Sequence, residues 1–322
     1  MTHPVQTPVA AVFMVEPGHY EWPAVLLAAS LRAFALDDIH LYGYCRAELI
    51  DQLHPRTLKF FDANGVTLRP ISPQFAVPYP QGNKLYACAD DRPQPATMLF
   101  DTDMFMLQPA RLSETLVPGY VSGRPTGNWM WGTGPQDWAP AYASVDLPLP
   151  RTRMSRPDGT FTCPSISAGF VAYSDSEFGA IWRDVALVIE NKRLARGIYP
   201  TLDQISLPVA AELIGLRLNM IDVKWNKAGK ITAQAIRGVI SYHYQKAETL
   251  LNLPVKWLAD RLLVEFSDFQ NVEELLDFYG REAARPAAVV HNDGWKKTIL
   301  AAQQRADSVT HAQAIGLHKQ DV

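Results

Sequence analysis

Two aspartates stand one residue apart in the segment Leu99-Phe100-Asp101-Thr102-Asp103-Met104, between two apolar stretches. Side chains two positions apart in an extended segment point the same way, so the carboxylates of Asp101 and Asp103 can converge on one point. Converging carboxylates repel each other unless a cation or a proton lies between them. Such oxygen ligands suit Mg²⁺ and Mn²⁺, which also bind phosphate oxygens. The alternative is a loop with two solvated aspartates, but the buried strand expected directly before the pair favours a metal site.

A histidine and a lysine could complete such a site. His243 follows an apolar run in the segment 239–244, and imidazole is an acceptable ligand for Mn²⁺. Lys84 opens an expected helix that leads toward the aspartate pair, where it could neutralise a phosphate or a carboxylate. Each has an ordinary alternative, a core histidine and a surface lysine.

A second polar pair, Asp203-Gln204, stands at the start of another expected helix. In the ordinary interpretation Asp203, or Thr201 before it, caps that helix. A functional interpretation of this pair depends on the other motifs of the chain.

The elements that must position these residues alternate between strand and helix patterns. Strands are expected at 10–16, 39–45, 66–71, 97–100, 166–173, 217–223 and 239–244, and helices at 22–36, 47–63, 83–90, 178–195 and 202–213. This alternation predicts an α/β fold with a mostly parallel central sheet and helices on both faces. Ligands of such sheets bind beyond the carboxyl ends of the strands, which is where Asp101 and Asp103 lie.

Residues 123–165 interrupt this alternation with much Gly, Pro and Trp, and we expect a long loop there. Its Trp129, Trp131 and Trp138 could stack on an acceptor sugar or could pack a flap onto the domain. Beyond Lys246 the pattern becomes helical, which predicts a C-terminal helical extension.

Composition limits the partners and the compartment. The chain has 48% hydrophobic residues and a net charge of −3, as in a soluble enzyme, and these values give no sign of a nucleic-acid partner. Three scattered cysteines suit neither a disulfide framework nor a thiolate zinc site. The chain shows neither a signal-peptide pattern nor a membrane-spanning apolar run. We expect a cytoplasmic protein that can lie peripherally at a membrane, and the sequence leaves its oligomeric state open.

Taken in order, these motifs resemble the nucleotide-sugar glycosyltransferases of the GT-A fold, and most of all family 8, which includes glycogenin and bacterial lipopolysaccharide galactosyltransferases. The motifs are Asn83-Lys84, the Asp-x-Asp pair, Ser167-Ala168-Gly169-Phe170, Asp203-Gln204, Trp225-Asn226 and His243-Tyr244. The resemblance covers about residues 9–246. It implies a Rossmann-like GT-A catalytic domain at 1–246, followed by the helical extension and polar tail at 247–322.

The resemblance also implies a role for each matching residue. Asp101, Asp103 and His243 match metal ligands, and Glu16 and Tyr20 fall where an acidic residue and a tyrosine hold the uracil nucleotide. Lys84 matches the basic residue that reaches the donor near the aspartate pair, and Ser167, Ala168 and Gly169 match a segment that lines the sugar pocket. Asp203 and Gln204 match the catalytic pair that faces the donor sugar, and Thr102 and Lys246 are expected near the donor. Some matches depart from the family pattern. Ser167 replaces an Asn, Glu16 stands where Asp is usual, and Lys246 follows His243 sooner than expected, without the usual Gly. These departures affect the identity of the base and the sugar more than the metal site.

The implied activity is metal-dependent transfer of a hexose from a nucleotide-diphosphate sugar, a UDP-sugar in family 8, to an acceptor hydroxyl with retention. The metal would be Mn²⁺ or Mg²⁺, and the acceptor a glycan, a lipid-linked sugar or a protein. Two alternatives stay open. One is a degenerate sugar-nucleotide-binding module. The other is a phosphohydrolase of the haloacid dehalogenase type, which carries its Asp-x-Asp near the first strand, whereas at least three expected strands precede Asp101 here.

Overall fold

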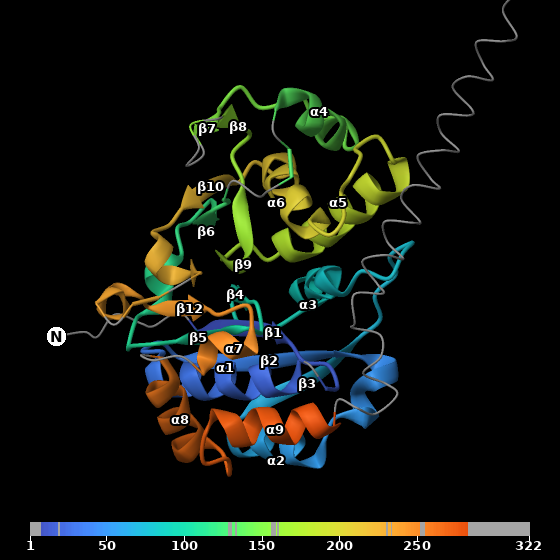
Figure 1. The fold of residues 1–322 in the computed structure, drawn as a ribbon. Helices are drawn as coiled ribbons and strands as arrows, with labels where there is room; N and C mark the ends of the chain where they lie inside the picture. The colour runs from blue at the N-terminus through green and yellow to red at the C-terminus, as the bar shows by residue number, and fades with distance from the viewer. Residues whose placement is uncertain are drawn as a thin grey trace, which may run out of the picture.

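The computed structural model describes residues 8–18, 20–127, 131–132, 134–155, 159, 161–229, 231–232, 234–251 and 255–282. Its centre is a seven-stranded sheet with the strand order β10-β6-β9-β4-β1-β2-β3 (Figure 1). All neighbouring strands are parallel except β9, which runs antiparallel to both β4 and β6. The strands are β1 (Val9–Met14), β2 (Ile39–Arg46), β3 (Val66–Ile71), β4 (Ala96–Phe100), β6 (Tyr120–Pro125), β9 (Ile166–Tyr173) and β10 (Arg217–Met220). The predicted mostly parallel α/β sheet is confirmed.

Strand β1 is buried on both faces, because apolar side chains alternate between two separate cores. Val9, Ala11 and Phe13 belong to one hydrophobic cluster, and Ala10 and Val12 belong to the other. Successive side chains of a strand point to opposite faces, so a wholly apolar strand needs a cover on each side. Helices supply both covers.

Helices cover both faces of the sheet (Figure 1). The first face carries α1 (Glu21–Phe34), α2 (Pro55–Ala63), α8 (Val255–Phe266) and α9 (Val272–Glu282). The second face carries α3 (Asn83–Ala89), α4 (Pro135–Ala143), α5 (Phe178–Lys192) and α6 (Leu202–Leu213). The predicted placement of helices on both faces is therefore confirmed. No helix in the described ranges is long and apolar enough to cross a membrane.

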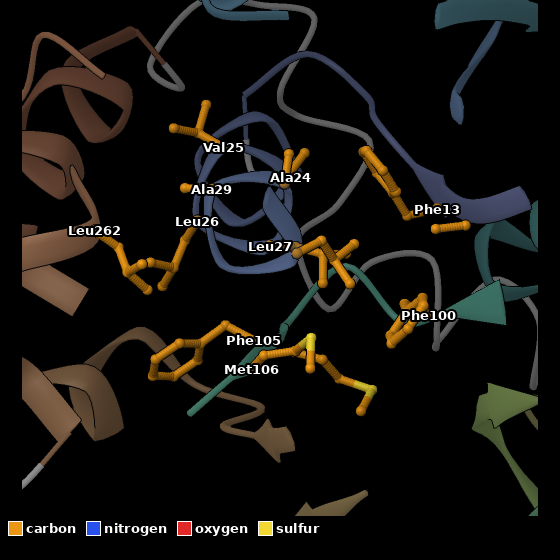
Figure 2. Close-up of a cluster of buried hydrophobic side chains, with 14 of the residues drawn as sticks. Phe13, Ala24, Val25, Leu26, Leu27, Ala29, Phe100, Phe105, Met106 and Leu262 are labelled. Carbon is orange, nitrogen blue, oxygen red and sulfur yellow. The ribbon is translucent and has the colours of Figure 1, made fainter. Parts of the chain in front are cut away.

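A second, three-stranded sheet lies beside the first core. Its strands are β11 (Lys227–Ala228), β12 (Ser241–His243) and β5 (Met104–Met106), and β12 pairs antiparallel with β5. Phe105 and Met106 of β5 are fully buried in the cluster that Figure 2 draws, close to Leu26 of α1. The aspartate pair is thus flanked by two buried strands, β4 before it and β5 after it.

The chain after Lys246 forms α7 (Ala247–Leu250), α8 and α9, as the helical pattern predicts. Figure 2 shows Leu262 of α8 pointing toward Leu26 of α1, and both belong to the first-face core. The division into units at 1–246 and 247–322 stays a prediction.

The predicted continuous helix at 47–63 is wrong. A 3₁₀ helix, η1, spans Ala47–Gln52, and α2 begins only at Pro55. The cause is Pro55, because the residue before a proline is driven to extended geometry. His54 is extended, and its Nδ1 accepts a hydrogen bond from the Arg56 N–H at 3.0 Å as the cap of α2.

The expectation of a structureless loop at 123–165 is also wrong. The end of β6, helix α4 and two short strands, β7 (Met154–Ser155) and β8 (Phe161–Thr162), lie in it. Trp138 of α4 is fully buried, and its indole N–H donates to Thr162 Oγ1 at 2.9 Å, so it packs the domain. Trp131 packs edge-on against Trp138, and Trp129 lies outside the described residues.

Two glycines inside helices provide a matched test of this packing. A Cβ on Gly179 of α5 would lie 2.0 Å from the carbonyl oxygen of Cys88 in α3, whereas one on Gly280 of α9 would meet nothing within 4 Å. We expect Gly179→Ala to lower the free energy of unfolding by about 1–3 kcal/mol through overpacking. Gly280→Ala should raise it by about 0.5–1 kcal/mol, since Ala favours helix. Denaturant unfolding followed by circular dichroism measures both, and a Gly179→Ala variant as stable as the parent would contradict the close approach of α3 and α5.

Candidate active site

The turn that carries the aspartate pair is fixed by backbone contacts on both sides. The Asp101 N–H donates to the Gly169 carbonyl of β9 at 2.7 Å, and the Met104 N–H donates to the Asp101 carbonyl at 3.2 Å. Between the two aspartates, the Thr102 hydroxyl donates to the Met14 carbonyl of β1 at 2.8 Å. Thr102 therefore anchors the turn, and the carboxylates of Asp101 and Asp103 are left to face a cavity.

His243 reaches the pair from β12, which is paired with β5 directly after the aspartates. Its Nε2 lies 3.0 Å from Asp103 Oδ1 and 3.9 Å from Asp101 Oδ2. One ligand atom from each of the three residues lies within 4.8 Å of the others. The predicted convergence of Asp101, Asp103 and His243 is present, and the arrangement can hold a metal ion.

The protonation of His243 supports this interpretation. Its Nδ1 lies 3.2 Å from the side-chain oxygen of Asn226, and an amide oxygen can only accept. Nδ1 therefore carries the proton, and Nε2 faces two carboxylates, an arrangement that needs a cation or a second proton between them. Burial alone would lower the pKa of His243, but the charge of Asp103 raises it above its usual value. Burial likewise opposes ionisation of Asp103, but His243 holds the pKa of Asp103 below its usual value.

Gly169 keeps the space beside the cluster open. A Cβ there would lie 3.0 Å from both Asp101 Oδ2 and Asn226 Nδ2, and 3.1 Å from His243 Cε1. These separations are tighter than nine in ten real Cβ contacts, so the neighbouring side chains would have to shift by a few tenths of an ångström to admit a larger residue. The glycine of the Ser-Ala-Gly segment thus fits close packing against the cluster.

A buried network joins the aspartates to the start of α6. The Lys84 ammonium bonds to Asp101 Oδ1, lies 3.4 Å from Asp203 Oδ2 and donates to the Ala168 carbonyl at 3.3 Å. Tyr79 donates its hydroxyl proton to Asp203 Oδ1 at 2.7 Å and accepts from the Asp203 N–H at 3.0 Å. Burial would lower the pKa of Lys84, but the carboxylates of Asp101 and Asp203 raise it well above its usual value, so Lys84 is charged.

The charges of this network do not balance. Asp101, Asp103 and Asp203 bring three negative charges against the one positive charge of Lys84. Burial raises the pKa of Asp203, and Lys84 opposes that rise. If all three carboxylates are ionised, the network carries an excess of two negative charges with His243 neutral and of one with His243 protonated, the form that its raised pKa favours. A divalent cation bound to neutral His243 would offset the first excess.

A cavity of about 200 Å³ opens onto the cluster. Its lining residues are Met14, Glu16, Tyr20, Pro80, Gln81, Lys84, Asp101, Thr102, Asp103 and His243. Burial, together with the charges of Asp103 and Glu16, raises the pKa of Tyr20 to about 12, so its phenol is neutral. Seven of the residues singled out in the sequence therefore meet in one cavity.

The other predicted site residues do not line this cavity. Ser167, Ala168 and Gly169 lie behind it on β9, and Ser167 Oγ accepts from the Gly169 N–H at 3.3 Å. Asp203 and Gln204 lie on the first turn of α6, and Lys246 is exposed. Their roles toward a substrate stay predictions.

Sequence reasoning missed two polar residues of the site. Asn226 was noted as part of a motif without a role, although it orients His243. Tyr79 stands in the Pro-rich segment 78–80 and gave no signal, although it holds Asp203.

A larger cavity, of about 520 Å³, lies between β10, α4 and α6. Its charged lining residues are Arg153, Glu212 and Arg217, and none of these belongs to the cluster in the described part of the chain that could hold a metal. The smaller cavity is therefore the better candidate for chemistry.

The sequence identifies the class of protein as a glycosyltransferase. A family model described as the Rhodobacterales glycosyltransferase domain matches residues 11–215. This match covers more than half of the chain, and the chain belongs to that family. The match ends inside the turn after α6, so it includes the aspartate pair, Lys84 and Asp203-Gln204 but not His243.

The chain was also compared with curated proteins and with solved structures. No curated protein matches the sequence. Among solved structures, the chain is similar to the apo structure of WbbM, a bifunctional glycosyltransferase, with a TM-score of 0.47 and 10% sequence identity over 86% of this chain and 52% of that chain. The chain thus spans about half the length of that protein, and the class assignment rests on the family match.

Removing Asn226 tests whether it prepares His243 for a metal. We expect Asn226→Ala to weaken Mn²⁺ binding about 10–100-fold, as loss of a hydrogen-bond partner of a ligating histidine does. Isothermal titration calorimetry with Mn²⁺ measures the change. The matched control is Asn219→Ala, whose amide instead donates to Ser122 on the neighbouring strand. If the two variants bind Mn²⁺ with equal affinity, Asn226 does not contribute to the metal site through His243.

Proposed function

We propose that this glycosyltransferase moves a hexose from a nucleotide-diphosphate sugar, a UDP-sugar, to an acceptor hydroxyl with the help of Mn²⁺ or Mg²⁺. The carrying observation is the convergence of Asp101, Asp103 and His243 within 4.8 Å at the carboxyl end of the sheet. The charge deficit around Lys84 supports a divalent ion there. Membership of a glycosyltransferase family favours glycosyl transfer over the phosphohydrolase alternative.

The protein's own residues divide the work of binding the diphosphate. Asp101, Asp103 and His243 would hold the ion, and Asn226 would keep His243 Nε2 turned toward it. When bound, the ion supplies Lewis-acid stabilisation of the diphosphate leaving group. Lys84 adds a fixed positive charge whose attraction grows as negative charge develops on the leaving oxygen. Its carboxylate partners hold the ammonium in place before the substrate arrives.

At the sugar end we assign different roles to two neighbouring residues. Both carboxylate oxygens of Asp203 are engaged by protein, with Tyr79 on Oδ1 and Lys84 near Oδ2. Asp203 is therefore proposed to position Lys84. We further propose that the acceptor hydroxyl attacks the sugar on the same face from which the diphosphate departs, which would retain the configuration of the anomeric carbon. Gln204 keeps a buried side-chain oxygen without a partner in the described residues, which makes it available to the sugar.

The proposal includes the GT-A fold and likeness to family 8. It is supported by the position of the Asp-x-Asp turn after β4 and by an antiparallel β9 beside that strand. The acceptor would be a hydroxyl of a glycan, a lipid-linked sugar or a protein, and the site of action the cytoplasm, including the membrane surface. Ser167, Gly169 and Lys246 are proposed to act near the donor.

Chelation and one substitution test the metal. We expect calorimetric titration with UDP to show binding in Mn²⁺ that is largely lost in excess EDTA. Asp103→Asn should abolish the Mn²⁺-dependent part while leaving the melting temperature near that of the parent, because the side chain faces a cavity. Asp51→Asn, on the exposed part of η1, is the matched control. UDP binding of equal strength with EDTA would remove the metal from the proposal.

Kinetics of a Gln204 variant test the sugar end. We expect Gln204→Ala to lower kcat and kcat/KM together, by about 10²-fold, as loss of one polar transition-state contact does. Release of UDP from a panel of UDP-hexoses identifies the donor, and steady-state rates with that donor give the comparison. A raised KM with kcat unchanged would reduce Gln204 to a binding residue. Tight UDP binding without release from any donor would favour the degenerate module.

A further inference from the structure

The residues that line the cavity fall into two chemical groups. Lys84 and the three candidate ligands carry charges, and we call their part of the cavity the metal end. The side chains of Met14, Tyr20, Pro80 and Gln81 carry no charge at neutral pH, and Glu16 is a further acidic residue of the lining. A nucleoside diphosphate has the same division, with a charged diphosphate joined through a ribose to a flat, uncharged base. If the diphosphate occupies the metal end, the uncharged residues, Gln81 among them, are left for the base.

Glu16, the remaining acidic residue of the lining, is already occupied by protein. Glu16 Oε1 accepts from Asn83 Nδ2 at 2.8 Å and from Arg46 Nε at 2.9 Å, while Oε2 accepts from the Arg46 terminal nitrogen at 3.3 Å. A carboxylate offers about four acceptor positions, so most of those of Glu16 are used. The residue that the family resemblance places at the base is thus held in an ion pair with Arg46.

Unlike the carboxylate of Glu16, the side-chain oxygen of Gln81 lacks a hydrogen-bond partner among the described residues. Its Oε1 is buried and has no hydrogen-bond partner in the described chain. Buried polar atoms are paired in the large majority of cases, so an unpaired one on a residue that lines a cavity points to a partner that the described chain does not supply. The amide oxygen can only accept, so its partner must bring an N–H or an O–H.

The turn that carries Gln81 is closely packed. Gln81 lies in the 3₁₀ turn η2 (Pro80–Gly82), and a Cβ on Gly82 would come within 2.2 Å of the Tyr79 ring and 2.5 Å of the Phe75 ring. The Gly82 N–H also donates to the Tyr79 carbonyl at 3.0 Å. Gln81 is therefore presented from a turn whose backbone has little room to move, as a specificity-determining residue requires.

We propose that Gln81 recognises the nucleobase of the donor, with Oε1 accepting a hydrogen bond from a ring N–H such as N3–H of uracil. This inference rests on the proposed function. The resemblance implies that Glu16 contacts the base, whereas this proposal assigns base recognition to Gln81, which belongs to none of the motifs.

The test uses three probes on the full chain in Mn²⁺: UDP, inorganic pyrophosphate and N3-methyl-UDP. We expect Gln81→Ala to weaken UDP binding about tenfold, in the range of one lost hydrogen bond in a buried site. Pyrophosphate occupies only the metal end, so its affinity should change less than about twofold. The parent should bind N3-methyl-UDP more weakly than UDP, and this difference should disappear in Gln81→Ala. Gln52→Ala, an exposed glutamine on η1, is the matched control.

Each other outcome overturns a distinct statement. If the parent does not bind UDP in Mn²⁺, the proposed function fails before Gln81 is tested. If the parent binds UDP and Gln81→Ala binds it equally well, the inference fails alone. Equal losses for UDP and pyrophosphate would place Gln81 at the metal end. If the difference between the parent and Gln81→Ala disappears with 2′-deoxy-UDP and persists with N3-methyl-UDP, the partner of Gln81 is the ribose hydroxyl, and base recognition is overturned. Melting temperatures of both variants check that they fold.

Discussion

Repulsion among three carboxylates, those of buried Asp203 and of partly buried Asp101 and Asp103, is the constraint around which this site is built. Asp101, Asp103 and Asp203 approach one another around a single lysine, where the low dielectric strengthens both repulsion and attraction. Lys84 satisfies Asp101 and Asp203 but leaves Asp103 with His243 alone. The excess of negative charge over the positive charge of Lys84 is why the cluster of Asp101, Asp103 and His243 could hold a cation.

The rest of the fold keeps these charges from moving apart. The aspartate turn lies between β4 and β5, and both strands are buried in the first-face core. The same core includes α1 and α8, so a segment beyond residue 246 contributes to the rigidity of a turn at residue 101. Because β12 pairs with β5, His243 is placed by the same sheet that fixes the aspartates. Repulsion that would open a loop is resisted here by packing.

The parts of the site predicted from sequence are those with a strong local pattern. Asp101 and Asp103 were found because a short apolar strand precedes them, and His243 because an apolar run ends on it. Asn226 and Tyr79 could not be found in this way, since their contacts join residues 17 and 124 positions apart. Helix α4 was missed because Gly and Pro obscured its period, although buried Trp138 shows that it is part of the second core. The break before α2 was readable in Pro55, since a proline disfavours helix in the residue before it.

Helix geometry explains why Asp203 and Gln204 need not share one task. Neighbouring residues on a helix point about 100° apart, so two adjacent side chains meet different surroundings. Asp203 points to Tyr79 and Lys84 and is almost fully buried, whereas Gln204 is half-buried and its side-chain oxygen has no partner among the described residues. Asp203 therefore stabilises the positive charge of Lys84, and Gln204 takes no part in that network. A sequence motif that looks like a single catalytic pair divides, in the fold, into support for Lys84 and a candidate contact to the sugar.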